Sequence, residues 1–130
     1  LRLDQKNIVC VSKCQNDIYV WYDKLQIEEV FTNFYTNAIN HSTGKIKISL
    51  KKTDGKAKLE VYNSGNKIPE NDLTRIWEKF YKVDKARTRE YGGNGLGLSI
   101  VKAILDNYDV EYGVDNVDDG VVFWCMFDCD

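Results

Sequence analysis

The chain has 130 residues, of which 43% are hydrophobic and 29% are charged. This size and balance fit one soluble globular domain and exclude a disordered chain or a pair of ordinary domains. The formal net charge of −2 excludes a general attraction to nucleic acid, and no apolar run in the sequence is long enough to span a membrane. The first residue is Leu1 rather than Met, so we expect a fragment of a longer protein.

The first part of the chain predicts two strands and a long helix. Residues 8–13 and 18–22 are short apolar-rich runs on either side of a turn at residues 16–17, and together they predict a hairpin. Asp23 is a good helix N-cap, because its carboxylate can accept a hydrogen bond from an unpaired N–H of the first turn. Apolar residues then recur at helical spacing to about residue 42, which predicts a helix with one buried face.

A second hairpin is predicted to follow this helix. Residues 45–51 alternate lysine or serine with apolar side chains, which indicates a half-buried strand. Asp54 and Gly55 form a strong two-residue turn signal, and the return strand includes Leu59 and Val61. The lysines are most simply the solvent face of this hairpin rather than a nucleic-acid patch.

The middle of the chain predicts short helices and a long loop. Residues 70–81 indicate one or two short helices. Four of their side chains are expected to be buried: Leu73, Ile76, Trp77 and Phe80. Residues 82–94 form a long, charged and glycine-tipped loop, of a length typical of a lid over a site.

The end of the chain predicts one more helix and a closing hairpin. The helix covers residues 96–107, and strands over 109–115 and 121–127 follow around a turn at 118–120. Hairpins dominate this order and helices interrupt them, which favours the α+β class. We predict a two-layer α/β sandwich in which a mixed, mainly antiparallel sheet of about five strands packs against about three helices.

Four glycines fall within six residues directly before the last predicted helix. They are Gly92, Gly93, Gly95 and Gly97. Glycine lets the backbone approach a ligand closely, and a helix N-terminus offers unpaired N–H groups and a partial positive charge, which suit a phosphate. The alternative is an ordinary turn before a core helix. The segment lacks the Gly-Lys-Ser/Thr ending of a P-loop, and it does not follow a strand as a dinucleotide fingerprint would.

Three asparagines share one stripe of the first long helix. Asn33, Asn37 and Asn40 are spaced by four and three residues, although asparagine is a mediocre helix former. They could supply oxygen ligands to a hard cation such as Mg²⁺ and donors to phosphate oxygens. The alternative is a polar solvent face, or one buried amide with a partner.

Four cysteines occur in two pairs, Cys10 with Cys14 and Cys125 with Cys129. A four-thiolate zinc site or disulfides are conceivable, but neither pair has the two-residue spacing common in zinc ribbons. We expect reduced, structural cysteines.

Taken together, four segments resemble the nucleotide-binding catalytic domain of two-component sensor histidine kinases, within the gyrase, Hsp90, histidine kinase and MutL superfamily. Residues 33–42 resemble its N box, 61–69 its first glycine box, 76–82 its F box and 93–98 its second glycine box. The resemblance extends over about residues 23–127. It implies a Bergerat-type ATP-binding fold with ATP and Mg²⁺ as cofactors.

The resemblance assigns roles at the phosphate end of the site. Asn37 matches the magnesium-binding asparagine, Asn33 lies one turn earlier at the same site, and Asn40 stands where a lysine is frequent. The implied catalytic residues are Asn33, Asn37, Lys82 and Arg87. The segment that would cradle the phosphates comprises Gly93, Gly95, Leu96, Gly97 and Leu98, and residues 82–94 match the ATP lid.

The resemblance also assigns roles at the adenine end. Asn63 matches the acidic residue that receives the adenine amino group, and the amide should bind it more weakly than a carboxylate. Gly65 would let the backbone pass close to the base, and Ile68 would pack against it. Lys67 replaces a glycine and could narrow the pocket. An ordinary turn residue is the alternative for Asn63.

One position separates a kinase from a hydrolase. ATPases of the superfamily carry a water-activating glutamate one turn before the magnesium asparagine, and here that position is Asn33, an amide that cannot take a proton. Glu28 and Glu29 do not match it. We therefore expect little ATP hydrolysis.

The function implied is that of an ATP-dependent protein histidine kinase catalytic domain that is not self-sufficient. It would bind Mg-ATP and donate the γ-phosphoryl group to a histidine on a separate dimerisation domain. That domain and a response regulator are the expected partners. We expect a monomeric fragment with no nucleic-acid partner, located in the cytoplasm as part of a membrane-anchored protein. The alternatives are a scaffold of the same fold that has lost ATP, or an anti-sigma-type serine kinase.

Overall fold

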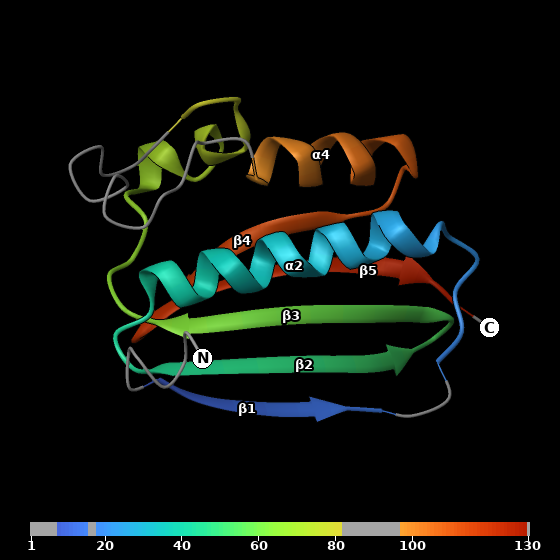
Figure 1. Cartoon of the computed structure of the whole chain (residues 1–130), viewed down its shortest axis with the longest axis horizontal. Coiled ribbons are helices and arrows are strands. Elements are labelled where there is room, and N and C mark those ends of the chain that lie inside the picture. The colour runs from blue at the N-terminus through green and yellow to red at the C-terminus, as the bar shows by residue number, and fades with distance from the viewer. Residues whose placement is uncertain (1–7, 16–17, 82–96, 130) are drawn as a thin grey trace.

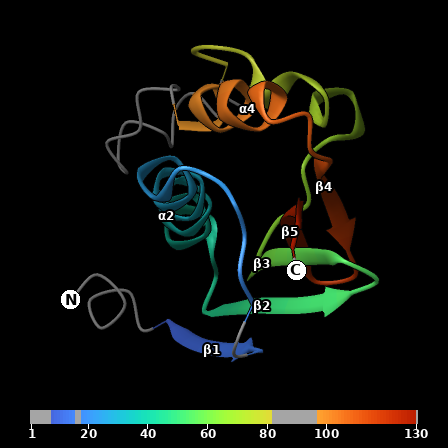
Figure 2. The ribbon, with the colours of Figure 1, turned by 90° about the vertical axis from the view of Figure 1, so that its right-hand side faces the viewer.

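The structure, a computed structural model, describes residues 8–15, 18–81 and 97–129. A five-stranded sheet forms one layer, and the helices form the second layer on one of its faces (Figures 1 and 2). The elements in chain order are β1 (Val9–Cys14), α2 (Lys24–His41), β2 (Lys45–Thr53), β3 (Lys56–Ser64), the 3₁₀ turns η1 (Glu70–Asp72) and η2 (Arg75–Trp77), α4 (Gly97–Asn107), β4 (Tyr112–Val117) and β5 (Gly120–Asp128).

The sheet is mixed and mainly antiparallel, which confirms the predicted fold class. The strand order is β1-β2-β3-β5-β4; β1 runs parallel to β2, and the other three pairings are antiparallel. Within the described ranges there are two α-helices rather than about three, because residues 70–81 form two short 3₁₀ turns. All the described helices lie on one side of the sheet, and no described element covers its other face (Figure 2).

The predicted hairpin of residues 8–13 and 18–22 is wrong. β1 pairs with β2 instead, from Val9 opposite Lys45 to Cys14 opposite Leu50, and residues 18–22 form no strand. The turn at 16–17 lies outside the described residues. Parallel neighbours cannot be joined by a tight turn and need a crossover, which α2 supplies here.

Residues 18–22 instead lead the chain from the sheet to the helix layer. The Tyr22 ring lies 4.7 Å from that of Tyr108 and 5.1 Å from that of Phe127, as measured between ring centroids. The Tyr22 hydroxyl accepts a hydrogen bond from the N–H of Asp128 at 3.0 Å. Val20 and Tyr22 of this run therefore pack against the core, whereas Tyr19 and Trp21 are exposed.

The predicted long helix is confirmed, with both ends capped. The Asp23 carboxylate accepts a hydrogen bond from the N–H of Gln26 at 3.0 Å, and the N–H of Ser42 donates to the carbonyl of Ala38 at 2.8 Å. The helix buries a stripe formed by Val30, Phe34, Ala38 and Ile39. This stripe orients the asparagine side chains at the margin of the buried face.

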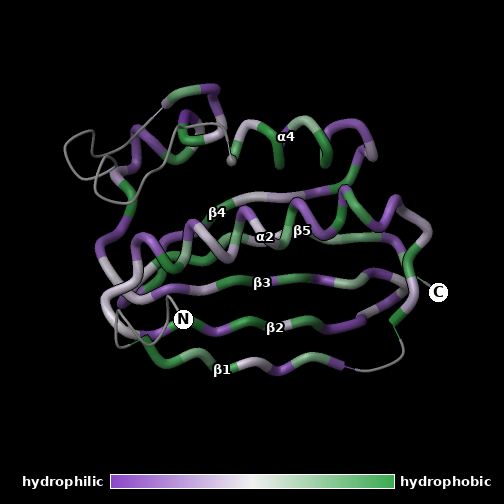
Figure 3. The backbone as a smooth tube through the Cα atoms, in the orientation of Figure 1, coloured by the Kyte–Doolittle hydropathy of each residue, from purple (hydrophilic) through white to green (hydrophobic). Residues whose placement is uncertain are grey.

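The core lies between the helix layer and the sheet. Alternate residues of β3 and β5 point into it, and the same alternation is visible along β2 in Figure 3. Asp54 and Gly55 have φ angles of 51° and 77°, as a type I′ hairpin turn requires, so the second predicted hairpin is confirmed. The strand predicted at 109–115 begins later, at Tyr112.

The expectation that Phe80 is buried is wrong. Ile76 and Trp77 are buried and Leu73 is half-buried, but the Phe80 side chain is 61% exposed. The segment turns extended at Glu78, directly after η2, so helical spacing no longer applies to Phe80. Trp77 fills the core position instead, with its ring 5.7 Å from that of Phe123.

Within the described ranges, neither α-helix combines the length and the apolar character needed to cross a membrane.

Candidate functional site

Side chains of α2 meet the first residue of α4. A Cβ built on Gly97 would lie only 2.7 Å from Oδ1 of Asn33, which is closer than any real contact of this kind. The Asn33 amide is held in this position because its Nδ2 donates to the carbonyl of Glu29 at 2.8 Å. Two motifs that lie far apart in the sequence thus lie side by side, and glycine at 97 leaves room for the Asn33 amide in this position.

The other two asparagines continue this stripe of α2. Asn37 and Asn40 are half-buried, as Asn33 is, beside the fully buried Phe34 and Ala38. No residue in the described part of the chain hydrogen-bonds the Asn37 side chain, which lies one turn from Asn33. The amide oxygen of Asn37 can therefore bind a ligand without first breaking a hydrogen bond to another described residue.

Asn63 is the one polar side chain buried among the described residues. It lies near the end of β3, is 3% exposed and follows Val61 in the inward-facing row. It is therefore a strand residue rather than a turn residue. Its Nδ2 donates to the carbonyl of Ser64 at 3.1 Å. This bond directs the amide so that Oδ1 remains the acceptor for a partner that donates.

Gly65 begins the segment after β3 and fits only as glycine. Its φ is 143°, and a Cβ there would lie 2.8 Å from the carbonyl oxygen of His41 at the end of α2. Its N–H donates to the carbonyl of Asp119 at 3.0 Å, and the N–H of Thr43 donates to the carbonyl of Ser64 at 3.0 Å. The end of β3 is thus fastened both to the end of α2 and to the β4–β5 turn.

Ile68 is held by a side chain that the sequence analysis missed. The N–H of Ile68 donates to Oδ1 of Asn116 at 2.9 Å, and Nδ2 of Asn116 donates to the carbonyl of Ile68 at 2.8 Å. The amide thus binds both backbone groups of one residue, as a neighbouring strand would. The sequence carried no clear signal for this role, because Asn116 directly follows the strand predicted at 109–115, whereas β4 extends to Val117.

The structure describes part of the predicted phosphate segment. Gly97 and Leu98 open α4, and Leu98 is half-buried against the core. Five predicted site residues lie outside the described residues: Lys82, Arg87, Gly93, Gly95 and Leu96. Their roles stay predictions.

The cysteines are all free thiols in the structure. Cys10 and Cys14 are exposed on β1, whereas Cys125 is fully buried in β5, and burial raises the pKa of its thiol to about 12. In the described ranges, no three His, Cys, Asp or Glu side chains are grouped as a metal site would need. Of the four thiols, only that of Cys125 is part of the buried core, and the expectation of a structural role stays a prediction for the others.

Residues 22–130 match the family described as histidine kinase-, DNA gyrase B-, and HSP90-like ATPase. The sensor protein VanSB of Enterococcus faecalis (strain ATCC 700802 / V583) is 35% identical over 104 residues, and the sensor histidine kinase YkoH of Bacillus subtilis (strain 168) is 37% identical over 100 residues. These matches cover 78% and 77% of this chain, but 23% and 22% of the relatives. The chain thus spans less than a quarter of their length.

A solved structure of the catalytic domain of histidine kinase ThkA, in a nucleotide-free form, has the same fold. Its TM-score is 0.86 at 30% identity, over 98% of this chain and 82% of that one. ThkA has also been solved in complex with the response regulator protein TrrA, with a TM-score of 0.81 at 26% identity over 99% of this chain and 36% of the other. From the family match over most of its length, and from the identity to sensor kinases, the chain belongs to the histidine kinase-, DNA gyrase B- and HSP90-like ATPase family and is of the sensor histidine kinase type.

Proposed function

We propose that this chain binds Mg-ATP and donates the γ-phosphoryl group to a histidine on a separate dimerisation and phosphoacceptor domain. The contact between Asn33 and Gly97 carries this proposal. It joins a stripe of amide oxygens to the N-terminus of α4, where unpaired N–H groups and the helix dipole favour phosphate. The amide stripe or the helix N-terminus alone would be weak support. Side by side, they offer oxygen ligands for a cation and N–H donors for the phosphate oxygens of one nucleotide.

The residues present fit magnesium and a purine. Amide oxygens are hard ligands, and Mg²⁺ needs few of them because it keeps waters and takes other oxygens from the nucleotide. When bound, Mg²⁺ would neutralise phosphate charge and hold the γ-phosphoryl group for transfer. Asn37 would be its main ligand, with Asn33 and Asn40 beside the phosphates.

At the other end of the site, Asn63 would receive the adenine amino group. Its Oδ1 is an acceptor, and its Nδ2 is already engaged by the carbonyl of Ser64. Gly65 would let the backbone approach the base, and Ile68, fixed by Asn116, would pack against the ring. Lys82, Arg87, Gly93, Gly95 and Leu96 would complete the phosphate side.

Transfer rather than hydrolysis follows from Asn33. An amide cannot accept the proton of an attacking water, and the Asn33 Nδ2 is in addition bonded to the carbonyl of Glu29. Phosphoryl transfer needs mainly positioning and charge neutralisation, which this site can supply to an acceptor brought by another domain. A response regulator is the proposed downstream partner, as suggested by the ThkA complex with TrrA.

Thermal unfolding with a non-hydrolysable ATP analogue tests nucleotide binding. Ligand that binds only the folded chain should add about 2.7 kcal/mol at a hundredfold excess over its Kd. We expect a magnesium-dependent rise in Tm that is lost in Asn37→Ala. Asn107→Ala, an exposed amide at the end of α4, is the matched control and should keep the full rise. No rise in the unchanged chain at millimolar nucleotide would overturn the proposal in favour of a scaffold role.

Phosphoryl transfer needs its own test. The chain is mixed with ATP and a purified dimerisation domain of a sensor kinase, and acid-labile phosphate on that domain is measured. We expect transfer in the mixture, none to the chain alone, and only slow release of inorganic phosphate. Acid-stable phosphoserine on a partner would instead support the anti-sigma-type kinase.

A further inference from the structure

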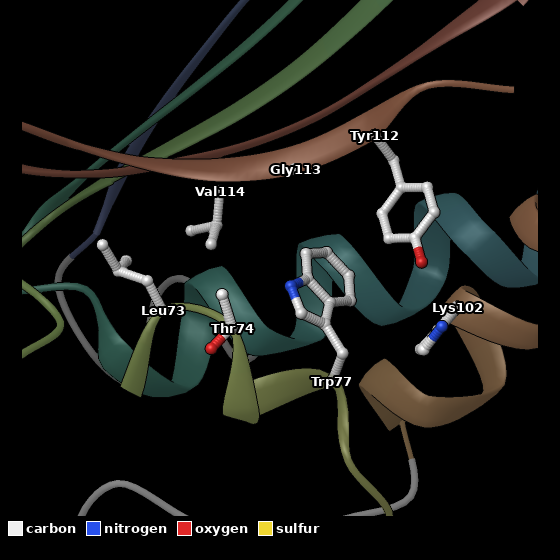
Figure 4. Close-up of a pocket in the computed structure, with 7 residues that line it drawn as sticks. All are labelled: Leu73, Thr74, Trp77, Lys102, Tyr112, Gly113 and Val114. Carbon is white, nitrogen blue, oxygen red and sulfur yellow. The ribbon is translucent and has the colours of Figure 1, made fainter. Parts of the chain in front are cut away.

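A groove separate from the candidate site runs between β4 and the 3₁₀ turns. It has a volume of about 440 Å³ and is lined by Leu73 and Trp77 on one side and by Tyr112 and Val114 on the other, with Lys102 of α4 at one end. Figure 4 shows the side chains of Trp77 and Leu73 facing Val114 and Tyr112 across it. None of the residues that line the groove belongs to the proposed nucleotide site.

The strand that borders the groove has a free edge. β4 is the last strand of the sheet and pairs only with β5 among the described strands. In an antiparallel pair, alternate residues direct both backbone groups to the partner. The N–H of Met126 donates to the carbonyl of Glu111 at 2.9 Å, which fixes this alternation. The N–H and C=O groups of Tyr112 and Val114 therefore point away from β5, toward the groove side.

The walls of the groove are mainly apolar, although Thr74 and Lys102 also line it. The ring of Trp77, 8% exposed, lies 5.0 Å from that of Tyr112 in an edge-to-face contact. On the other face of β4, the Trp124 ring covers Gly113, where a Cβ would lie 2.9 Å from it. Past the end of the groove, the side chain of Asn116 already holds Ile68. As far as the described residues go, no strand pairs with this edge from Tyr112 to Val114, and it is occupied beyond.

The surroundings of this edge are acidic. Residues 103–130 contain no Lys or Arg. The exposed acids on and around β4 are Asp106, Asp109, Glu111, Asp115, Asp118 and Asp119. Lys102 does not reverse this charge, because its Nζ lies 2.5 Å from Oδ2 of Asp106, and this contact lowers the pKa of the Asp106 carboxyl. A segment bearing Lys or Arg would be favoured here.

We propose that this edge binds an extended basic peptide segment of a partner, which adds a strand to β4. The segment would hydrogen-bond the outward backbone groups of Tyr112 and Val114. Every second side chain would enter the apolar groove, and the alternate Lys or Arg side chains would face Glu111 and Asp115. Main-chain pairing supplies the affinity, and charge and groove shape select the segment.

Titration of the chain with three short capped peptides tests this proposal by amide NMR. The probe alternates lysine with valine, the second peptide alternates glutamate with valine, and the third is the probe with alternate backbone nitrogens methylated. We expect only the probe to shift the amide signals of Tyr112, Val114 and Trp77 in a saturable way. Equal binding of the methylated probe would exclude strand addition, and binding of the acidic peptide would exclude a basic occupant.

Two variants locate the site on the chain. Val114→Pro removes an N–H that points away from β5, so no hydrogen bond between β4 and β5 is lost, and edge strands tolerate proline at such positions. The variant should weaken binding of the probe about tenfold or more. If this variant does not fold, the double variant Glu111→Lys with Asp115→Lys, which changes two exposed side chains, is used in its place. We expect it to lose the same amount of affinity for the probe. Glu28→Lys, an exposed acid on α2, is the control. Unchanged probe binding in the folded variants would overturn the proposal. The ATP-analogue rise in Tm is measured alongside and should be unaffected.

Discussion

At the scale of single residues, the candidate site depends on close fits that only small or amide side chains allow. Asn33 and Gly97 share one such fit, and Gly65 and the carbonyl of His41 share another. The sequence indicated the asparagine stripe because asparagine is a mediocre helix former, and Gly97 because it belongs to a dense glycine cluster at a helix start. It did not indicate that Asn116 holds Ile68, because that pairing joins residues 48 positions apart.

Gly97→Ala should weaken Mg-ATP binding more than it weakens folding. The new Cβ would meet Oδ1 of Asn33, the end of a side chain that can rotate, so the fold survives while the amide leaves its place. We expect a loss of about tenfold in nucleotide affinity, equivalent to about 1.4 kcal/mol, measured by calorimetry. In an Asn33→Ala background the same glycine change should have little further effect; a full additional loss there would contradict the steric explanation.

Asn116→Ala should loosen the segment that carries Ile68. Two hydrogen bonds to backbone groups are lost, so we expect the free energy of unfolding to fall by about 1–3 kcal/mol. Nucleotide affinity should fall as well, because the adenine side would no longer be preorganised. Denaturant unfolding and analogue titration measure the two effects. The matched variant Asn116→Asp keeps the acceptor for the N–H of Ile68 and should be intermediate; a stability equal to that of the unchanged chain would refute the two-point contact.

At the scale of elements, local sequence signals correctly predicted the helices and strands whose pairing partners are close in the sequence. The long helix, the hairpin at Asp54 and Gly55, and the closing hairpin each follow from caps, turns and periodicity. The pairing of β1 with β2 could not be found this way, because its partner lies beyond an intervening helix. A different limit applies to residues 70–81, where the backbone turns extended at Glu78 and Phe80 therefore leaves the predicted helical face.

Asp23→Ala should destabilise α2 at its first turn. The carboxylate accepts a hydrogen bond from the N–H of Gln26, and without it this N–H can bond only to water. We expect the free energy of unfolding to fall by about 1 kcal/mol. Denaturant unfolding followed by circular dichroism gives the change. Lys24→Ala is the neighbouring control, since its side chain is 88% exposed and its ion pair with Glu28 spans 4.0 Å. Equal effects of the two changes would mean that the cap contributes nothing.

At the scale of the whole molecule, charge and burial are unevenly distributed. Lysines gather on β2 and β3, whereas the last two strands carry only acids. The near-neutral total of −2 conceals this separation, so composition alone excluded a general electrostatic partner but could not predict the acidic edge. The core likewise joins residues from both layers, and Cys125 is one of its fully buried members.

Cys125 should report unfolding of the whole domain. Its thiol has a pKa raised to about 12 by burial, so at mildly alkaline pH almost none of it is the reactive thiolate, and reagent cannot reach it. We expect alkylation of the exposed Cys10 and Cys14 within the dead time, and of Cys125 only as denaturant populates the unfolded chain. Mass spectrometry of digested samples distinguishes the sites. Rapid labelling of Cys125 in native buffer would contradict its burial.

The parallel strand β1 has a consequence for how the sheet opens. All six of its residues are exposed, yet it covers one edge of β2. Its own side chains bury little apolar surface, although Ile8 directly before it belongs to the core, so we expect β1 to separate from the sheet in a local fluctuation that leaves the rest of the core intact. Its amide hydrogens should exchange with solvent much sooner than those of β3, as mass spectrometry in heavy water would measure. Each such opening bares the row of backbone groups on β2 to any other strand nearby, so β2 becomes a second edge, besides that of β4, at which two copies of the domain could pair.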